Sequence, residues 1–351
     1  MRKIFFLILL LLVPSGLMAE DVVVDWYPVA ATGCTPTYGT ELHTAANAAE
    51  PDVSDTDAVT GFSQVGLLTW DSVDTAPHIG TYHITAIASS SVDRFYYNLS
   101  GLTDGTLYSI SAHTRHNGTG GDWRLGLGTS SGGVFGPGAI LIATADTTYI
   151  QWTLYFYKQY NIAYVVALEN NATDDGGIYF DNFSIKEVTS PCLGSELNTT
   201  ANATSPTNEA NASTSWVGTG LDVLSSVSSD TPADGTYQLN IAESGTPTAS
   251  ARASLDIGTL YSLVDGTSYL VSFYAKHIGT GGNWNVAING TDATSTSNTI
   301  LTLTSAYVTH ARYGIEIVYS STWRYLVVYE NNASNDGGVF IDGLSIKTIA
   351  R

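Results

Sequence analysis

Basic residues are scarce in this sequence. In 351 residues, 13 Lys and Arg stand against 32 Asp and Glu, which gives a formal net charge of −19. A nucleic-acid-binding surface needs clustered Lys and Arg to neutralise phosphates, so the charge balance argues against nucleic acid as a partner. The acidic excess suits solubility, divalent cations or a neutral partner. An acidic solvated surface on an exported protein explains it more simply than a charge-driven function does.

Helical periodicity and catalytic motifs are also missing. After the N-terminus, no long segment repeats apolar residues at helical spacing, and no stretch is apolar enough to span a membrane as a helix. There is no Gly-x-Ser-x-Gly elbow, phosphate loop or dinucleotide fingerprint. Glycoside hydrolysis needs two carboxylates that flank one bond. Glu169 with Asp175, and Glu330 with Asp336, are available, but nothing singles out either pair. We therefore predict that the chain is not an enzyme.

What the sequence does contain is one segment that occurs twice. Glu169 to Lys186 (ENNATDDGGIYFDNFSIK) corresponds to Glu330 to Lys347 (ENNASNDGGVFIDGLSIK), at an offset of 161 residues. A duplication of this kind predicts two copies of one domain. We place the first domain at residues 34–189 and the second at residues 190–351.

The strand pattern within each repeat predicts the fold class. Gly, Ser, Thr and 21 Tyr favour strands and turns. Each repeat holds eight or nine short strand-like runs with regular turn signals, which is typical of an antiparallel β-sandwich. In the closing strand of the first repeat, alternation predicts Ile178 and Phe180 on one face, and Tyr179, Asp181 and Phe183 on the other. An acid among apolar residues needs a partner or a metal ion.

The residues ahead of the repeats predict export. Arg2 and Lys3 precede a short apolar run at residues 5–13, so residues 1–19 have the features of a secretory signal peptide. An uncleaved anchor is the alternative. We expect a secreted protein, extracellular or at a cell surface. Residues 20–33 have no counterpart in the second repeat, and their Val-rich and aromatic run predicts an extra strand. It either packs on domain 1 or mediates self-assembly by adding to the sheet of another molecule.

The two cysteines, Cys34 and Cys192, flank the first repeat. Cys34 lies before its first predicted strand, and Cys192 lies just after its last. Domain termini are often close in space, and export permits disulfide bonds. We therefore predict that these cysteines pair and close domain 1, with free or intermolecular thiols as the alternatives.

Several short motifs resemble carbohydrate-binding modules of families four and nine. Both repeats contain Glu-Leu followed by an Asn-containing loop, Gly-Thr-Tyr-x-[Ile/Leu], Leu-x-Asp-Gly-Thr-x-Tyr-x-[Ile/Val]-Ser and Gly-Gly-[Ile/Val]-[Tyr/Phe]-[Phe/Ile]-Asp. The resemblance covers nearly all of both repeats. It implies an all-β protein with two tandem galactose-binding-like jelly-roll domains. It also implies a non-catalytic protein that binds a polysaccharide or a surface glycan.

The resemblance also implies a structural calcium ion at the edge of each sandwich. The implied ligands are Asp181 and Asp342 in the closing strands, Glu209 in the second N-terminal loop, and Asp55 in the first, with Asp57 or Glu50 as alternatives. Carboxylate oxygens are suitable calcium ligands. The familiar Asn-Gly-x-Phe-Glu pattern is absent from both copies, however. The alternative role for the closing-strand acids is to accept backbone hydrogen bonds at turns.

The candidate ligand-binding residues lie on one strand in each repeat. Alternation places His113 and Arg115 opposite the core in the first repeat, and Tyr274 and Lys276 in the second. A flat ring beside a cation and hydroxyl groups suits a saccharide. The two tryptophans after the Gly-rich turns, Trp123 and Trp284, either close this surface or begin strands and are half-buried. Because the paired residues differ, we expect any two sites to differ in preference.

A structural function is the alternative to carbohydrate binding. The extra strand predicted within residues 20–33, together with the lack of an attached catalytic domain, suits a subunit of a surface layer, fibre or adhesive assembly.

Overall fold

The structure, a computed structural model, describes most of both repeats. The described residues are 34–43, 61–67, 69–78, 82–90, 93–128, 130–133, 139–159, 162–170, 176–198, 215–228, 230–243, 251–279, 282–293, 299–331 and 337–349. The predicted signal peptide (1–19) and the predicted extension strand (20–33) lie outside this set. Within it, no helix has both the length and the apolar character needed to cross a membrane.

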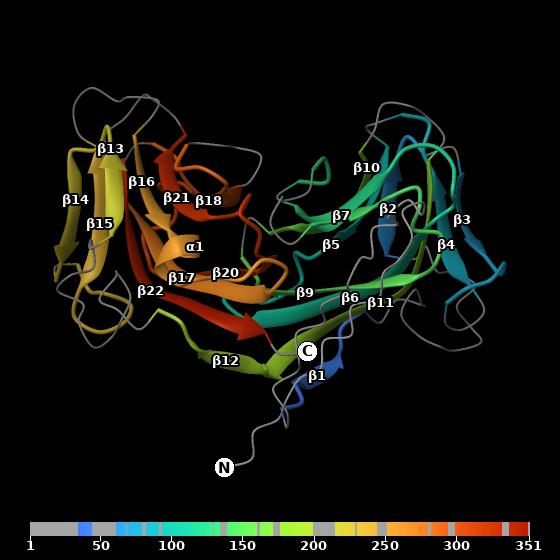
Figure 1. Cartoon of the computed structure of the whole chain (residues 1–351), viewed down its shortest axis with the longest axis horizontal. Helices are drawn as coiled ribbons and strands as arrows, with labels where there is room; N and C mark the ends of the chain where they lie inside the picture. Colours follow the sequence, from blue (N-terminus) through green and yellow to red (C-terminus); the bar gives the residue numbers. More distant parts are fainter. Residues whose placement is uncertain are drawn as a thin grey trace, which may run out of the picture.

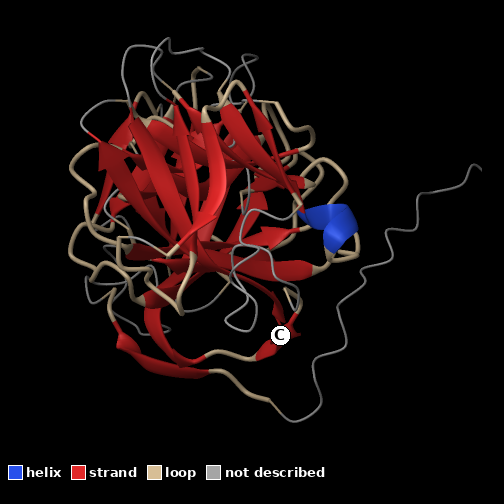
Figure 2. Cartoon of the chain, turned by 90° about the vertical axis from the view of Figure 1, so that its left-hand side faces the viewer, coloured by secondary structure: helices blue, strands red, loops and turns tan. Residues whose placement is uncertain are grey.

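Almost all of the described secondary structure is β-strand (Figure 2). The first repeat supplies β1 (Thr37–Glu41), β2 (Phe62–Val65), β3 (Thr69–Val73), β4 (His83–Ile87), β5 (Arg94–Asn98), β6 (Leu107–His116), β7 (Trp123–Gly128), β8 (Ile140–Ile142), β9 (Ile150–Tyr157), β10 (Tyr164–Glu169) and β11 (Gly177–Ser190). The second supplies β12 (Leu193–Glu196), β13 (Trp216–Thr219), β14 (Val223–Val227), β15 (Gln238–Glu243), β16 (Arg252–Asp256), α1 (Ile257–Leu260), β17 (Ser268–Gly279), β18 (Trp284–Asn289), β19 (Thr299–Leu303), β20 (Ala311–Val318), β21 (Tyr325–Glu330) and β22 (Gly337–Ile349).

These strands form three antiparallel sheets. One sheet of twelve strands runs through both repeats in the order β14-β15-β22-β17-β20-β9-β6-β11-β4-β3, with β1 added to β11 and β12 added to β22. A five-stranded sheet covers each half of it, β2-β5-β10-β7-β8 in the first repeat and β13-β16-β21-β18-β19 in the second. Figure 1 shows the long sheet as the shared floor of two sandwiches that stand side by side. The chain is therefore all-β, as the sequence predicted.

The two repeats join through their inner edge strands. β9 pairs with β20 at a single registered position, Phe156 with Ile315. Next to this pair the Tyr155 amide donates a 2.9 Å hydrogen bond to the Glu316 carboxylate. Tyr155 and Glu316 are 161 residues apart, the offset of the repeat, so they occupy equivalent places in the two domains. The seam therefore lies on a pseudo-two-fold axis, and it removes one exposed sheet edge from each domain.

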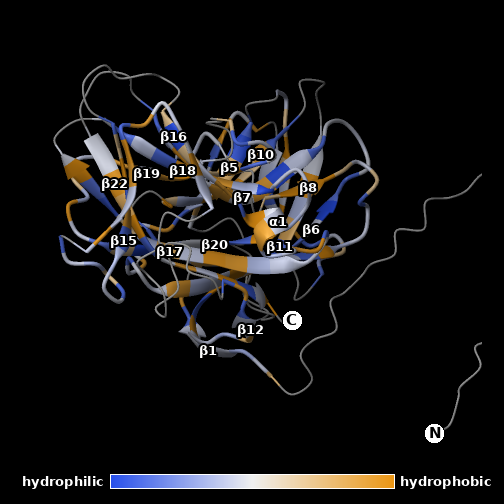
Figure 3. Ribbon diagram, turned by 60° about the vertical axis from the view of Figure 1, so that its left-hand side comes forward, coloured by the Kyte–Doolittle hydropathy of each residue, from blue (hydrophilic) through white to orange (hydrophobic). Residues whose placement is uncertain are grey.

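Figure 3 shows hydrophilic and hydrophobic residues mixed along the strands. Because successive side chains of a strand point to opposite faces, the buried apolar ones form the cores between the sheets. In β6 the side chains of Tyr108, Ile110 and Ala112 are buried against the smaller sheet. Trp123 and Trp284 are fully buried, at 0% exposure. Aromatic rings such as Phe95 and Phe180, whose centroids are 5.3 Å apart, pack edge to face in the first core.

The closing strand departs from the predicted alternation. Phe183 was expected to share a face with Tyr179 and Asp181, but its side chain is fully buried in the core with Phe180. A β-bulge between Asp181 and Ser184 causes the change, because the extra residue shifts all later side chains to the other face. Asn182 adopts a positive φ of 50° there, and Gly343 adopts 54° at the equivalent point of the second repeat. Both residue types tolerate this conformation.

A repeated glutamate ties the first strand of each domain to the closing strand. The Glu41 carboxylate accepts hydrogen bonds from the Ile185 amide at 2.8 Å and from the Ser184 hydroxyl. Glu196 makes the same contacts with Ile346 and Ser345 in the second domain. The repeated Glu-Leu motif is therefore explained by strand anchoring.

A disulfide bond closes the first domain. Cys34, just before β1, bonds to Cys192, which lies between β11 and β12, with the Cα atoms 5.8 Å apart. The bond spans a sequence separation of 158 residues. A long cross-linked loop restricts the unfolded chain strongly, so the bond stabilises the folded state.

Candidate functional site

The outer face of the long sheet carries a cluster of aromatic, imidazole and cationic side chains in the first domain. His113 and Arg115 project from β6 on the side away from the core, as alternation predicted. Tyr179 on β11 and Tyr149 just before β9 extend the cluster to the neighbouring strands. We call these four residues, with His78 of the loop after β3, the domain 1 face.

Arg115 is at the centre of the domain 1 face. Its guanidinium carbon lies 4.3 Å from the centroid of the Tyr179 ring and 5.0 Å from that of Tyr149. Such contacts are attractive because the ring face is electron-rich. Among the described residues Arg115 forms no ion pair, and its buried Nε has no hydrogen-bond acceptor. The guanidinium is thus held by aromatic rings and keeps unused donor capacity.

The loop after β3 forms one side of the domain 1 face. The rings of His78 and His113 stack at 3.9 Å with an interplanar angle of 24°. The His78 amide donates a 2.7 Å hydrogen bond to the buried Asp181 carboxylate, and Arg115 donates a long 3.4 Å bond to the Ala76 carbonyl. Asp181 therefore fixes this loop on the sheet beside the predicted ligand residues.

The second domain repeats the arrangement with different side chains. Tyr274 and Lys276 lie on β17, with His310, Arg312 and Phe340 on the neighbouring segments; we call these five residues the domain 2 face. The Lys276 ammonium group is 5.2 Å from the Phe340 ring. It also donates to the Asp230 carbonyl at 2.6 Å and pairs with the Asp230 carboxylate at 3.1 Å.

The two faces therefore offer different charges to a ligand. Lys276 is only 6% exposed and is held by Asp230, so its charge is neutralised locally. Arg312 instead stacks on Tyr157 of the first domain at 4.4 Å, across the seam. The equivalent cations on β6 and β17 therefore differ, because among the described residues Lys276 has an ion-pair partner and Arg115 has none.

Burial keeps His113 and His310 uncharged near neutral pH. Burial and the neighbouring His78 lower the pKa of His113 to about 4. Burial, together with the Lys276 charge, lowers the pKa of His310 to about 4. Neutral imidazoles can both donate and accept hydrogen bonds. The faces therefore combine few charges with many rings and polar atoms.

Trp123 and Trp284 do not belong to either face. Both begin strands of the smaller sheets, β7 and β18, and both are fully buried between the sheets. Of the two alternatives for these candidate ligand residues, the structure supports the one in which they begin strands, and it buries them fully, so neither is placed to contact a ligand. Sequence reasoning missed the other members of the faces, which are His78, Tyr149, Tyr179, His310, Arg312 and Phe340. Tyr149 and Tyr179 show why, because only the strand order of the sheet brings them next to Arg115.

The predicted calcium ligands are only partly within the described residues. Asp55, Asp57, Glu50 and Glu209 lie outside them. The Asp342 carboxylate accepts hydrogen bonds from the Asp234 and Gly343 amides at 2.9 and 2.8 Å, and so anchors a loop as Asp181 does. Within the described ranges, no three His, Cys, Asp or Glu residues are grouped closely enough to hold a metal ion. Calcium stays a prediction.

The carboxylates that were considered for hydrolysis are not placed as a described pair. Glu169 and Glu330 are buried at the ends of β10 and β21, at 1% and 3% exposure. Asp175 and Asp336 lie outside the described residues. The arrangement seen on the two faces suits binding through rings, hydrogen bonds and a cation.

Comparison with known proteins finds solved structures that resemble this chain at low similarity. No protein-family model matches the sequence, and no curated protein matches it either. The tandem CBM22-1–CBM22-2 domain of Xyn10C from Paenibacillus barcinonensis is 12% identical, with a TM-score of 0.33, over 91% of this chain and 100% of that one. A structure titled "CBM4 structure and function" is 13% identical, with a TM-score of 0.26, over 38% of this chain and 94% of that one.

An enzyme is also among the matches. The arabinose-bound α-L-arabinofuranosidase MgGH51 is 17% identical, with a TM-score of 0.30, over 45% of this chain and 25% of that one. At such low identities and TM-scores, these likenesses carry no argument about what this chain binds or whether it catalyses a reaction. Family four, one of the two families that the motifs resemble, is represented among them.

Proposed function

We propose that this protein is an exported, non-catalytic carbohydrate-binding protein that recognises an extracellular or cell-surface glycan through the outer faces of its long sheet. The observation that carries the proposal is the stacking of Arg115 between Tyr149 and Tyr179 on the domain 1 face. Sugar rings stack their C–H groups on aromatic side chains, and their hydroxyl groups accept hydrogen bonds from a guanidinium. The motif resemblance to carbohydrate-binding modules points to the same ligand class.

Calcium has a supporting role in this proposal. We infer that an ion, if bound, would lie at the edge of the sandwich near Asp181 or Asp342 and would stiffen the loops there. The ligand contacts themselves are assigned to the faces. A melting temperature that is equal in calcium and in chelator would remove the ion from the proposal and leave the faces unaffected.

The test is a glycan-array screen of the exported chain with calcium, followed by affinity measurements on single variants. We expect Arg115→Ala, His113→Ala or Tyr274→Ala to weaken a saccharide hit about tenfold or more, because each removes a ring or donor from a face. Arg124→Ala is the matched control. Arg124 is exposed on β7, on the outer side of the smaller sheet, and its loss should change affinity little.

A blank array with well-folded protein would reject the carbohydrate proposal. The structural alternative, a subunit of a surface layer, fibre or adhesive assembly, would then be tested by electron microscopy of the chain with and without residues 20–33. Loss of assembly on deletion of these residues would support self-assembly through the extension.

A further inference from the structure

The seam between the domains leaves room for a pocket. β9 and β20 pair at one registered position only, so the two strands separate on either side of it. On one side they enclose a pocket of about 430 Å³, which we call the seam pocket. Both domains line it, with Ala139, Ile140, Gln151, Trp152, Thr153 and Leu154 from the first and Gly266, Glu316, Val318, Tyr319, Ser320 and Trp323 from the second.

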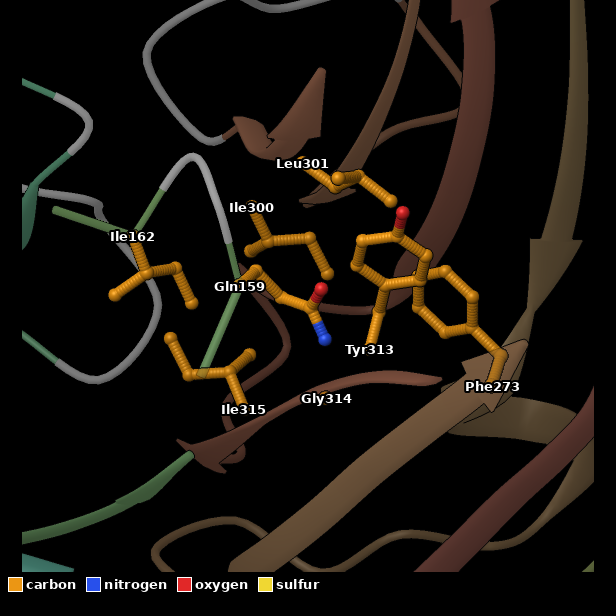
Figure 4. Close-up of a pocket in the computed structure, with 8 residues that line it drawn as sticks. All are labelled: Gln159, Ile162, Phe273, Ile300, Leu301, Tyr313, Gly314 and Ile315. Atoms are coloured by element: carbon orange, nitrogen blue, oxygen red, sulfur yellow. The ribbon is translucent and has the colours of Figure 1, made fainter. Parts of the chain in front are cut away.

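The pseudo-symmetric place on the other side of the seam is filled. There, a cavity of only about 10 Å³ remains. Figure 4 shows its lining, with Gln159 at the centre among Ile162, Ile300 and Ile315. The repeat offset relates this lining to the seam pocket, since Ile300 corresponds to Ala139 and Gln159 corresponds to Ser320.

Side chains of different size occupy equivalent positions on the two sides of the seam. Ile300 and Gln159 occupy volume that Ala139 and Ser320 leave free. Phe273, which also lines the filled cavity and stacks on Tyr313 at 5.9 Å, corresponds to the small Ala112. Other pairs differ in the opposite sense, since Trp152 and Trp323 of the seam pocket are larger than Tyr313 and Ile162 of the filled cavity. The positions of Ala139 and Ser320 are therefore the ones to exchange in a test.

We propose that the seam pocket binds a single neutral sugar ring. This assignment of the ligand class rests on the proposed function, but the site is separate from the two faces. Its volume is within the range of small-molecule sites, which is roughly 300–1,000 Å³. Three large aromatic side chains line it, Trp152, Tyr319 and Trp323, beside the hydroxyl groups of Thr153 and Ser320.

The charge of the lining and the exposure of its rim limit which ligands fit the seam pocket. Glu316 is the one acidic or basic residue among the described residues that line the pocket. The Glu316 side chain is buried, at 2% exposure for the residue, and accepts a hydrogen bond from the Tyr155 amide, so its negative charge disfavours an anionic sugar. Val318, at 51% exposure, leaves the mouth accessible to solvent.

The experiment fills the pocket with the side chains of its own counterpart. The double variant Ala139→Ile/Ser320→Gln is compared with the parent chain by calorimetry, using the methyl glycosides of xylose, arabinose, glucose and galactose as probes. We expect at least one glycoside to bind the parent, and the double variant to bind it about tenfold more weakly or not at all. Trp323→Ile, which copies Ile162, is a second variant that removes an aromatic wall without filling the space.

The outcomes separate this proposal from the proposed function. Unchanged glycoside binding in both variants, with unchanged melting temperatures, would overturn the proposal that the seam pocket binds a sugar. A parent chain that binds none of the four glycosides would overturn it as well. Arg115→Ala should leave glycoside binding in the pocket intact while it weakens binding to the polysaccharide identified on the array. Glycoside binding without any polysaccharide binding would retain the seam pocket and reject the sheet faces.

Discussion

The two domains keep the same anchors and differ in what they present. In each, a glutamate of the first strand, Glu41 or Glu196, accepts a hydrogen bond from the closing strand. In each, an aspartate of that strand, Asp181 or Asp342, holds the loop that borders the outer face. These contacts define the sandwich, and they are equivalent in the two copies.

The outer faces are where the copies diverge. Arg115 lies between two tyrosine rings, whereas its counterpart Lys276 is neutralised by Asp230. Tyr149 is replaced by His310. The divergence leaves the fold intact because the side chains concerned are outside both cores. The comparison indicates that one set of residues maintains the fold in both domains and another set, on the outer faces, determines what each domain binds. The predictions below test this division.

The largest loss of stability, of similar size in the two domains, is expected when the buried tryptophans are replaced. Trp123→Ala and Trp284→Ala should each reduce the free energy of unfolding by about 3–5 kcal/mol, because each leaves a large cavity between the sheets. Chemical denaturation monitored by circular dichroism measures the loss. Two nearly equal losses would support equivalent cores, whereas a loss confined to one variant would break the comparison.

A smaller loss of stability is expected when the glutamates that bind the closing strands, Glu41 and Glu196, are replaced. Glu41→Ala and Glu196→Ala should each cost about 1–3 kcal/mol, because the buried amides of Ile185 and Ile346 lose their acceptors. The ion pairs to Lys186 and Lys347, at 3.8 and 3.9 Å, should add little, since they are partly exposed.

A matched pair of variants isolates this hydrogen-bonding contribution. Lys186→Ala and Lys347→Ala remove only the ion pairs, and we expect both to change the unfolding free energy by less than about 1 kcal/mol. Lysine variants as damaging as the glutamate variants would show that charge pairing, and not amide capping, holds the first strands.

A loss of stability as the pH rises above about 4.5 is expected from a carboxyl pair in the second domain. Burial and the neighbouring Glu243 carboxyl raise the pKa of Glu330 to about 8, from a usual value of 4.5. In the first domain Ala88 takes the place of Glu243. Between these pH values the folded protein holds a proton on Glu330 that the unfolded chain releases. The stability that this group contributes is therefore fully present below about pH 4.5 and is lost as the pH rises to about 8.

Removing the second carboxyl should flatten this dependence. We expect Glu243→Ala to raise the melting temperature at pH 8 by a few degrees, roughly, and to change it little at pH 5. Glu187→Ala, at an exposed position of β11, is the control and should leave the pH profile unchanged. A Glu243 variant with the profile of the parent would remove the carboxyl pair as its cause.

Period-two alternation was enough to predict the strand faces wherever a strand is regular. It placed Ile110 in the core and His113 and Arg115 outside it, because β6 contains no bulge. It failed after Asn182, where a single residue of positive φ reverses the faces. Asn and Gly at equivalent positions of the two repeats carry a signal for that bulge, but alternation alone does not use it.

Contacts between strands that are distant in the sequence could not be predicted from the sequence pattern. Tyr149 and Tyr179 come from segments well separated from Arg115, and only the strand order β9-β6-β11 brings them together. The seam was also not predicted. Pairing of two edge strands needs only matched backbone groups, and the single registered pair of Phe156 and Ile315 leaves no local pattern.

The finest comparison exchanges one residue between the faces. His113→Tyr and Tyr274→His each give one face the side chain that the other face has at the equivalent strand position. Because stacking area and hydrogen-bonding groups both differ, we expect each exchange to shift the relative affinities for two glycans by a few-fold, about 1 kcal/mol, and to leave stability nearly constant. Affinity ranking of the array hits on both variants measures the shift. Rankings that move in opposite directions would show that these positions set preference in each domain. Identical rankings would place specificity in the surrounding residues, with Arg115 and the rings around it as the next positions to exchange.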